Sequence, residues 1–352
     1  MPTQRKFSLL LPAFVLAALL AFPVAAQATL AYVKNPFHAT VFVADDDGSG
    51  ARKVGPGRSP RVSPDGNWVA YLQEGPKFAQ ELKLAPTAGG AGRTLMANFR
   101  ESFYLAWSPD STQIAALRGP ELGKRTLVVI DVATGAEHFI AQGYFSGFSF
   151  SPEGGQLVYA RAGKELFPLR SDVFRIDILP PGAVSVAPIL PVKITKDHRN
   201  LDPLWGPNGQ VVLAKWALRK NREYGPRNEL YLMDSAGKGV KRLTKTEVGP
   251  LLQGLFPTDW SADGKRLLAE FEGQDTSYAV VVNPQTGAQR PVAGTGETGF
   301  VGTDLSADGS VVLGFNGGFD PGIRNHKVQT VPYAGGKPKT LVKEALEPSW
   351  NR

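Results

Sequence analysis

A short turn motif recurs six times along the chain, and this repeat limits the possible fold more than any other feature of the sequence. Each copy has an aromatic or aliphatic residue, a small residue and then a Pro/Ala-Asp/Asn-Gly-type turn. Counted from the small residue, successive copies lie 45, 43, 55, 55 and 45 residues apart. A period of this length indicates a repeat architecture. The six copies are Val62-Ser63-Pro64-Asp65-Gly66, Trp107-Ser108-Pro109-Asp110, Phe150-Ser151-Pro152-Glu153-Gly154, Trp205-Gly206-Pro207-Asn208-Gly209, Trp260-Ser261-Ala262-Asp263-Gly264 and Leu305-Ser306-Ala307-Asp308-Gly309.

Each copy of the motif is followed by short β-rich runs. One run follows the turn directly, as in Gln156–Ala160, and later runs such as Thr126–Asp131 and Lys241–Thr244 flank a glycine-bearing hairpin. Proline pre-sets the backbone of such turns, and glycine supplies the positive φ that they need. The pattern predicts four antiparallel strands per unit, and such units arranged radially are the blades of a β-propeller.

The two ends of the chain are predicted to complete one blade together. Leu30–Tyr32 matches Val69–Tyr71, the second strand of the next unit, and the missing inner strand is supplied by Glu347–Trp350. Closure of this kind pairs strand edges that would otherwise be exposed. Seven blades require about 46 residues each, a common blade length, whereas six require about 54. We therefore predict an all-β, seven-bladed propeller closed by a composite blade, with a six-bladed propeller as the alternative.

The N-terminal segment has the pattern of a secretory signal peptide. Two basic residues precede the apolar stretch Phe7–Phe22, and small residues then allow cleavage after Ala26 or Ala28. We favour Ala28, which assigns residues 1–28 to the signal peptide and residues 29–352 to a single propeller domain. The prediction is a periplasmic or secreted protein without a membrane span after cleavage, and the alternative is an uncleaved anchor. No other apolar run approaches the length that spans a bilayer.

Composition excludes several kinds of chemistry. The chain has no cysteine, so it has no thiol nucleophile and no cysteine-based metal site. Its net charge of +7 falls to +5 without the signal peptide, which is too weak to predict a nucleic-acid partner. The acidic run Asp45–Gly50 lies at a hairpin position and lacks a distal glutamate, so we interpret it as a turn and not as a calcium loop. The four histidines, His38, His138, His198 and His326, are dispersed along the chain. We therefore expect no metal and no cofactor.

The Trp-Ser-Pro-Asp-Gly type of repeat, followed by a glycine-bearing hairpin, resembles the WD-repeat-like propeller units of the TolB family of periplasmic proteins. The resemblance covers the whole predicted mature chain and implies a β-propeller that binds other proteins. TolB-type proteins carry an N-terminal domain ahead of the propeller, and we expect this chain to lack it. Related repeats also occur in the propellers of prolyl-oligopeptidase-type peptidases and of tricorn-like assemblies, so the repeat is specific for the fold and weak for function.

Four tryptophans occupy one position of the repeat, and we predict that they pack as wedges between blades. They are Trp107, Trp205, Trp260 and Trp350.

Basic residues gather in the connections between the second and third strands of three consecutive units. In antiparallel blades these connections lie on one face, and propeller function is usually found where loops vary. Arginine presents a planar fork that suits carboxylates and phosphates. The predicted binding residues are Arg118, Lys124, Arg125, Arg161, Lys164, Arg170, Arg219, Lys220, Arg222 and Arg227, against the acidic residues Glu121, Glu165 and Glu223. The alternative is a solvated charged surface without a partner.

The sequence thus favours a non-enzymatic, monomeric binding or scaffold protein whose basic loop face takes an acidic protein or an envelope polymer. Two alternatives stay open: a lyase or hydrolase that acts on an acidic glycan, and a propeller that gates a separate peptidase. Catalytic carboxylates can converge from distant blades in a propeller, and the sequence alone does not locate them.

Overall fold

The structure is a computed structural model of an all-β chain. It describes residues 29–75, 80–99, 105–119, 123–164, 170–217, 227–245, 254–273, 276–293, 299–317 and 325–351. Within these ranges the only helix is a single 3-10 turn, Pro36–His38, so the expectation of an all-β fold is confirmed.

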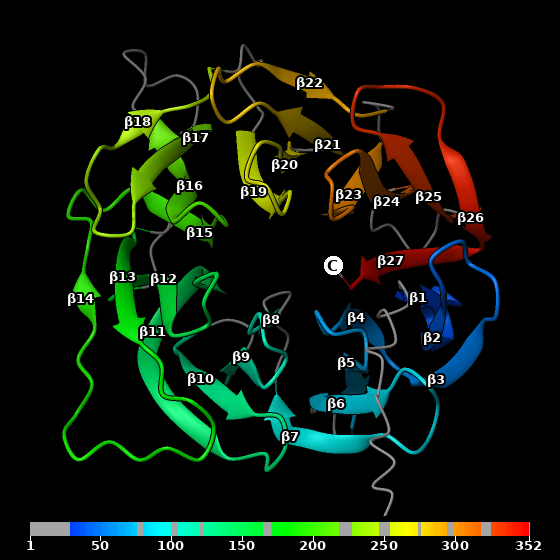
Figure 1. Cartoon of the computed structure of the whole chain (residues 1–352), viewed down its shortest axis with the longest axis horizontal. Helices are drawn as coiled ribbons and strands as arrows, with labels where there is room; N and C mark the ends of the chain where they lie inside the picture. Colours follow the sequence, from blue (N-terminus) through cyan, green and yellow to red (C-terminus); the bar gives the residue numbers. More distant parts are fainter. Residues whose placement is uncertain are drawn as a thin grey trace, which may run out of the picture.

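The strands form five sheets of antiparallel neighbours, arranged around a common centre (Figure 1). The first pairs β27 (Ala345–Trp350), β1 (Thr29–Lys34), β2 (Thr40–Asp45) and β3 (Arg52–Pro56), and the next pairs β4 (Arg58–Val62), β5 (Trp68–Glu74), β6 (Gln80–Pro86) and β7 (Arg93–Phe99). A seven-stranded sheet runs through β8 (Leu105–Trp107), β9 (Gln113–Arg118), β10 (Arg125–Asp131), β11 (Glu137–Phe150), β12 (Gln156–Ala162), β13 (Asp172–Asp177) and β14 (Val192–Lys193).

The last two sheets contain the remaining twelve strands. An eight-stranded sheet comprises β15 (Asn200–Trp205), β16 (Gln210–Ala217), β17 (Arg227–Asp234), β18 (Lys241–Arg242), β19 (Gly254–Trp260), β20 (Leu267–Glu272), β21 (Ser277–Val282) and β22 (Gln289–Pro291). Its two halves meet at one parallel pair, Asn228 with Gly254. The last sheet comprises β23 (Phe300–Leu305), β24 (Val311–Asn316), β25 (Lys327–Pro332) and β26 (Lys339–Lys343).

The repeated motif forms the turn after each innermost strand, and a serine hydroxyl holds it closed. In the first copy, Ser63 Oγ donates to Asp65 and accepts the backbone N–H of Trp68 at 3.0 Å. The serines of the second, fifth and sixth copies make the same pair of bonds. These bonds lower the pKa of the turn aspartate, to about 2 at Asp308. The recurrence of Ser-x-Asp is therefore explained by local turn chemistry.

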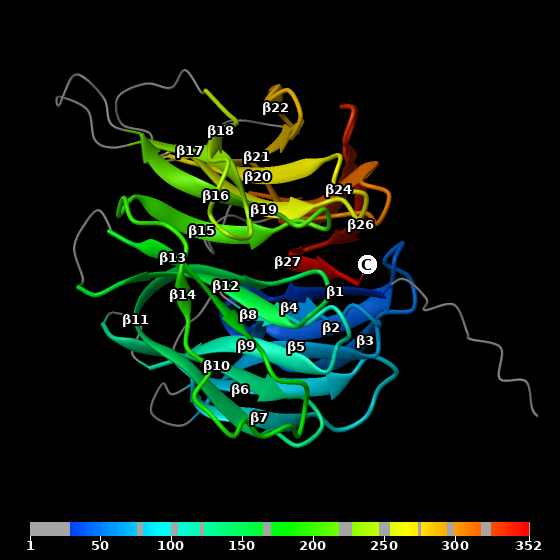
Figure 2. The same ribbon diagram turned by 60° about the vertical axis from the view of Figure 1, so that its left-hand side comes forward.

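Apolar side chains fill the space between neighbouring sheets, which pack face to face (Figure 2). One core joins Leu82 and Leu84 of β6 to Ile114 and Ile130 of the adjacent sheet. The four repeat tryptophans pack into or against these cores, which agrees with their predicted role as wedges. A Cβ at Gly206 would lie 3.0 Å from the Trp260 ring, which explains why this copy of the motif has glycine in place of serine.

Side chains near the ends of innermost strands also link neighbouring sheets by hydrogen bonds. Ser149 Oγ accepts the backbone N–H of Trp205 at 2.8 Å, and Ser349 Oγ accepts that of Val62 at 3.2 Å. Asp259 plays the same part, because its Oδ2 accepts the N–H of Leu305 at 2.7 Å. Both serines and Asp259 are buried, so these bonds fix neighbouring sheets where they converge.

The two ends of the described chain close the ring, as predicted. Strand β27 pairs antiparallel with β1, with Leu30 opposite Trp350 and Ala31 opposite Ser349. The backbone N–H of Thr29 also donates to the Asn351 side chain at 2.5 Å. The predicted turn Asp45–Gly50 joins β2 to β3, with the N–H of Gly48 donating to the carbonyl of Asp45.

Candidate functional site

The predicted basic residues lie at the ends of strands that meet on one side of the sheets. The connections β9–β10, β12–β13 and β16–β17 all join a second strand to a third strand, so they leave the sheets in the same direction. We call the surface formed by the described residues at these strand ends (118–119, 123–125, 161–164, 170–172, 217 and 227–229) and by the link 194–199 the basic face. Three predicted residues, Arg219, Lys220 and Arg222, fall outside the described residues.

Three residues of the basic face are exposed at its rim: Lys124, Lys164 and Arg170. They lie on two neighbouring connections of the seven-stranded sheet. Their charges are exposed to solvent and therefore accessible to a partner.

Two predicted arginines flank β11, Arg125 on β10 and Arg161 on β12. The guanidinium of Arg125 donates to the carbonyl of Phe145 at 3.2 Å, and Arg161 stacks over the Phe174 ring at 4.6 Å. Gly143 pairs with Arg125 in the sheet, and a Cβ at this glycine would meet the Arg161 side chain at 2.7 Å. The absence of a side chain at Gly143 therefore leaves room for the Arg161 side chain over β11.

Arg118, which was also predicted to bind a partner, forms an ion pair with Glu137 at 2.7 Å. Glu137 is the first residue of β11, so the guanidinium of Arg118 reaches across β10. Its charge is partly neutralised within the sheet.

Arg227 belongs to a buried charge cluster at the start of β17. Its guanidinium lies 2.7 Å from Oε1 of Glu229, and Arg242 lies 3.1 Å from the same oxygen. Glu229 is fully buried and its Oε2 accepts the Thr244 hydroxyl at 2.7 Å. Two arginines thus share one buried carboxylate at this end of the face.

An equivalent cluster surrounds Asp172 at the start of β13. Lys193 Nζ and His198 Nδ1 lie 2.6 and 2.7 Å from its Oδ2, and Thr195 donates to its Oδ1 at 3.3 Å. The backbone N–H of His198 donates to the same Oδ1. Asp172 is buried while His198 is largely exposed, so the carboxylate presents the imidazole to solvent on the basic face.

Asp197, in the link to β15, is held by two cations. Lys215 Nζ lies 2.7 Å and Arg199 3.0 Å from its Oδ2, and Asn200 donates to its Oδ1 at 2.6 Å. Partial burial tends to raise the pKa of Asp197, but the hydrogen bonds from Lys215 and Asn200 and the two positive charges outweigh burial and lower that pKa. The carboxylate therefore stays ionised and orders the surrounding cations.

Sequence reasoning did not identify Asp172 and Glu229, the carboxylates at the centres of the two buried clusters. It also missed the cations that β14, β18 and the link 194–199 contribute. A usable signal was present, because Lys193-Ile194-Thr195 and Arg242-Leu243-Thr244 occupy matching positions after β13 and β17. In each triplet the threonine hydroxyl contacts the buried carboxylate and the first residue supplies a cation.

The histidines occupy separate environments. His326 is buried with Nδ1 3.0 Å from the carbonyl of Asn316, and His138 Nε2 lies 3.2 Å from Asp131. Within the described part of the chain, no three His, Asp or Glu side chains are grouped in a way that could hold a metal ion.

With this geometry in view, the chain was compared with known proteins. No family model and no curated protein matches the sequence. Among solved structures, TolB from Acinetobacter baumannii matches with a TM-score of 0.54 and 15% identity, over 93% of this chain and 67% of that one. The fold is that of a β-propeller. The structural similarity to TolB agrees with the resemblance inferred from the repeat.

The propeller is shared with proteins of other activities. The β-propeller domain of the Trilobed protease from Pyrococcus furiosus matches with a TM-score of 0.61 and 16% identity, over 89% of this chain and 92% of that one. An oligogalacturonate lyase in complex with manganese matches with a TM-score of 0.57 and 13% identity, over 89% of this chain and 84% of that one. At identities this low, the structural similarity establishes the fold and leaves the activity open.

Proposed function

We propose that this propeller is a non-enzymatic binding or scaffold protein whose basic face takes an acidic protein or an acidic envelope polymer. The observation that carries the proposal is the continuity of cations across the basic face. Arg125 pairs with Gly143 in the sheet, Arg161 packs beside the same glycine, and Lys124, Lys164 and Arg170 are exposed nearby in the chain. Charges arranged in this way steer an oppositely charged partner and fix its orientation.

The clusters at Asp172 and Glu229 favour a basic face that recognises a partner over a charged surface that is only solvated. Asp172 holds a lysine and a histidine, and Glu229 holds two arginines, at fixed positions. Side chains that are already ordered lose less conformational entropy on binding, which favours affinity.

Two further statements belong to this proposal. We propose seven blades, since the strands fall into seven groups of four when the long sheets are divided at β11 and between β18 and β19. We also propose export by a signal peptide in residues 1–28, which lie outside the described residues. Among those that are described, no helix is long and apolar enough to cross a membrane. N-terminal sequencing of the protein from its native host would test the export proposal and should give Thr29 as the first residue.

Two soluble polyanions test the binding proposal: poly-L-glutamate and polygalacturonate. Their affinity for the protein should fall as salt is added, because charges separated by more than about 8 Å are screened at physiological ionic strength. Reversing Lys124, Lys164 and Arg170 to glutamate should weaken binding about tenfold or more and flatten the dependence on salt. Folding should change by less than about 0.5 kcal/mol, because all three side chains are exposed.

A matched control reverses Lys238, Lys265 and Lys337, three exposed lysines at turns on the opposite side of the sheets. This control should retain affinity and salt dependence close to those of the unchanged protein. Equal losses in both triple variants would show that only net charge matters, and no loss in either would contradict the proposal. Release of unsaturated oligosaccharides from polygalacturonate would instead identify a lyase.

A further inference from the structure

Large apolar side chains are exposed together at one place on the molecule, away from the basic face. Seven such side chains are exposed among the described residues, and five of them lie on β11, on β14 or on the connection that joins β13 to β14. Soluble proteins rarely expose contiguous apolar patches, and such patches mark interaction sites. The five residues, which we call the apolar patch, are Phe139, Val184, Val186, Leu190 and Val192.

The connection between β13 and β14 is unlike the other hairpin turns on its side of the molecule. Residues 178–192 form an uncharged run of fifteen residues with four prolines, whereas the equivalent turn between β10 and β11 spans residues 132–136. No hydrogen bond joins the backbone of Val184 or Val186 to another described residue. The N–H and C=O groups of Val184 and Val186 can therefore pair with the backbone of a partner segment.

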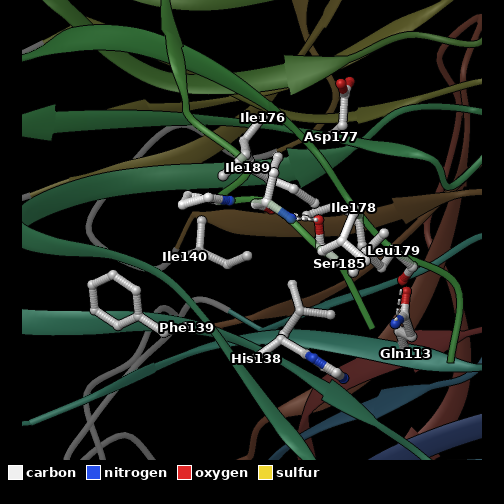
Figure 3. A pocket seen from close by; sticks show the side chains of 14 residues that line it. Gln113, His138, Phe139, Ile140, Ile176, Asp177, Ile178, Leu179, Ser185 and Ile189 are labelled. Atoms are coloured by element: carbon white, nitrogen blue, oxygen red, sulfur yellow. Dashed lines mark hydrogen bonds between the residues drawn. The ribbon is translucent and has the colours of Figure 1, made fainter. Parts of the chain in front are cut away.

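Beneath this connection lies a cavity of about 480 Å³. Figure 3 shows His138, Phe139 and Ile140 of β11 on one side of it and Ile178 and Ile189 of the connection on the other. Two buried side chains, Gln113 and Asp131, hold the connection in place. Gln113 donates to the carbonyl of Leu179 at 3.0 Å, and Asp131 accepts the N–H of Gly182 at 3.0 Å.

The few charges around the cavity are acidic. Asp177 lines it and is exposed, and none of the residues lining the cavity is lysine or arginine. His138 itself lies 3.2 Å from Asp131. A ligand that fits here is therefore apolar, and its complementary charge is positive.

We propose that the cavity and the apolar patch bind an extended segment of a partner protein that carries large apolar side chains beside a lysine or arginine. The segment lies along 183–187 and pairs with the free backbone groups there. One apolar side chain enters the cavity between Ile140 and Ile189, and the basic side chain faces Asp177. The exposed side chains of Val184 and Val186 supply apolar contacts to this segment.

Charge complementarity favours a different protein over a second copy of this chain. If two copies met through residues 178–192, they would bring no positive charge to Asp177, because that run is uncharged. The site is also independent of the basic face. The β13–β14 connection leaves β13 at the end opposite the β12–β13 connection, so each surface can be tested without changing the other.

A phage-displayed library of random twelve-residue peptides tests this proposal on the whole folded protein. Peptides enriched on the unchanged protein should carry large apolar residues at alternate positions and a neighbouring lysine or arginine. A synthetic peptide with the enriched sequence, followed by fluorescence anisotropy, should bind Val186→Asp and Ile189→Asp about tenfold or more weakly. Asp177→Lys should reverse the preference for basic over acidic flanking residues.

The matched control is Val240→Asp, which changes another exposed valine on a different hairpin and should leave peptide affinity unchanged. The proposal is overturned if no peptide is enriched relative to selection on Val186→Asp, or if acidic flanking residues are enriched. It is also overturned if sedimentation velocity shows a dimer that Val186→Asp converts to a monomer, since the patch would then bind a second copy. Loss of polyanion binding in the variant of the basic face has no bearing on these outcomes.

Discussion

Glu270 on β20 is a largely buried carboxylic acid with incomplete hydrogen bonding. The Ser277 hydroxyl donates to its Oε1, while its Oε2 has no partner among the described residues. Burial raises the pKa of Glu270 to about 8, and the nearby charge of Glu272 raises it further, against the opposing hydrogen bond from Ser277. The carboxyl group is therefore largely protonated at neutral pH in the folded protein.

Glu270→Gln should consequently change how stability depends on pH. The folded protein holds this proton more tightly than the unfolded chain, so the contribution of Glu270 to stability is complete below pH 4.5. That contribution is lost as the pH rises toward about 8. The glutamine variant does not lose stability in this way. Its free energy of unfolding, relative to that of the unchanged protein, should therefore rise by up to about 1.4 kcal/mol per pH unit between pH 4.5 and about 8. Urea unfolding at pH 5 to 8 would measure this, and parallel profiles for the two proteins would contradict it. Exposed Glu153→Gln is the control.

Glu229 presents a different case, a buried carboxylate that lies against two arginines and a threonine hydroxyl. Glu229→Gln removes the negative charge that Arg227 and Arg242 share, and breaking a buried ion pair from one side costs about 3 kcal/mol. We expect a loss of this size in chemical denaturation. Asp197→Asn, at a half-exposed carboxylate with two cations, should cost only about 1 kcal/mol. Similar losses for both variants would show that burial of Glu229 has little effect.

At the level of strands and turns, the sequence predicted the elements whose formation depends on local chemistry. The Ser-x-Asp turn and the strands beside it carry their own hydrogen-bonding and apolar pattern, so β10, β12 and β18 lie within a few residues of the predicted runs. The packing of Arg161 against Gly143 and the fold of residues 178–192 over β11 depend on residues far apart in the sequence. One chain without related sequences does not reveal such contacts.

The bonds between innermost strands give a prediction at this same scale. Ser149→Ala and Ser349→Ala each leave a backbone N–H of the next sheet without its partner, which should cost about 1–3 kcal/mol. Because the two serines link different pairs of sheets, the double variant should lose the sum of the single losses. Thermal and urea unfolding would measure all three variants. Exposed Ser310→Ala should change stability little, and a loss in it as large as in Ser149→Ala would contradict the special role of the innermost strands.

The whole molecule is a ring of sheets, and only the pairing of β1 with β27 joins its two ends. The other sheets are joined by chain connections, whereas this junction depends on hydrogen bonds and packing alone. The match between Leu30–Tyr32 and Val69–Tyr71 made the closure predictable from sequence, because a repeat that begins within a unit requires its missing strand from elsewhere. Glu347 adds a contact that the repeat did not predict, since its carboxylate accepts the backbone N–H of Ser59 at 2.6 Å.

Removing Leu346–Arg352 should therefore destabilise the entire ring and not only its last strand. The truncation exposes the edge of β1, removes the acceptors that Glu347 and Ser349 provide for β4, and takes Trp350 from the core that it packs against. Loss of one large aromatic contact alone suggests at least about 3 kcal/mol. Trp350→Ala should show part of this loss and retain one cooperative transition, whereas the truncated protein should melt earlier and more broadly. If the truncated protein melts cooperatively at the temperature of the unchanged protein, closure through β27 contributes nothing to stability.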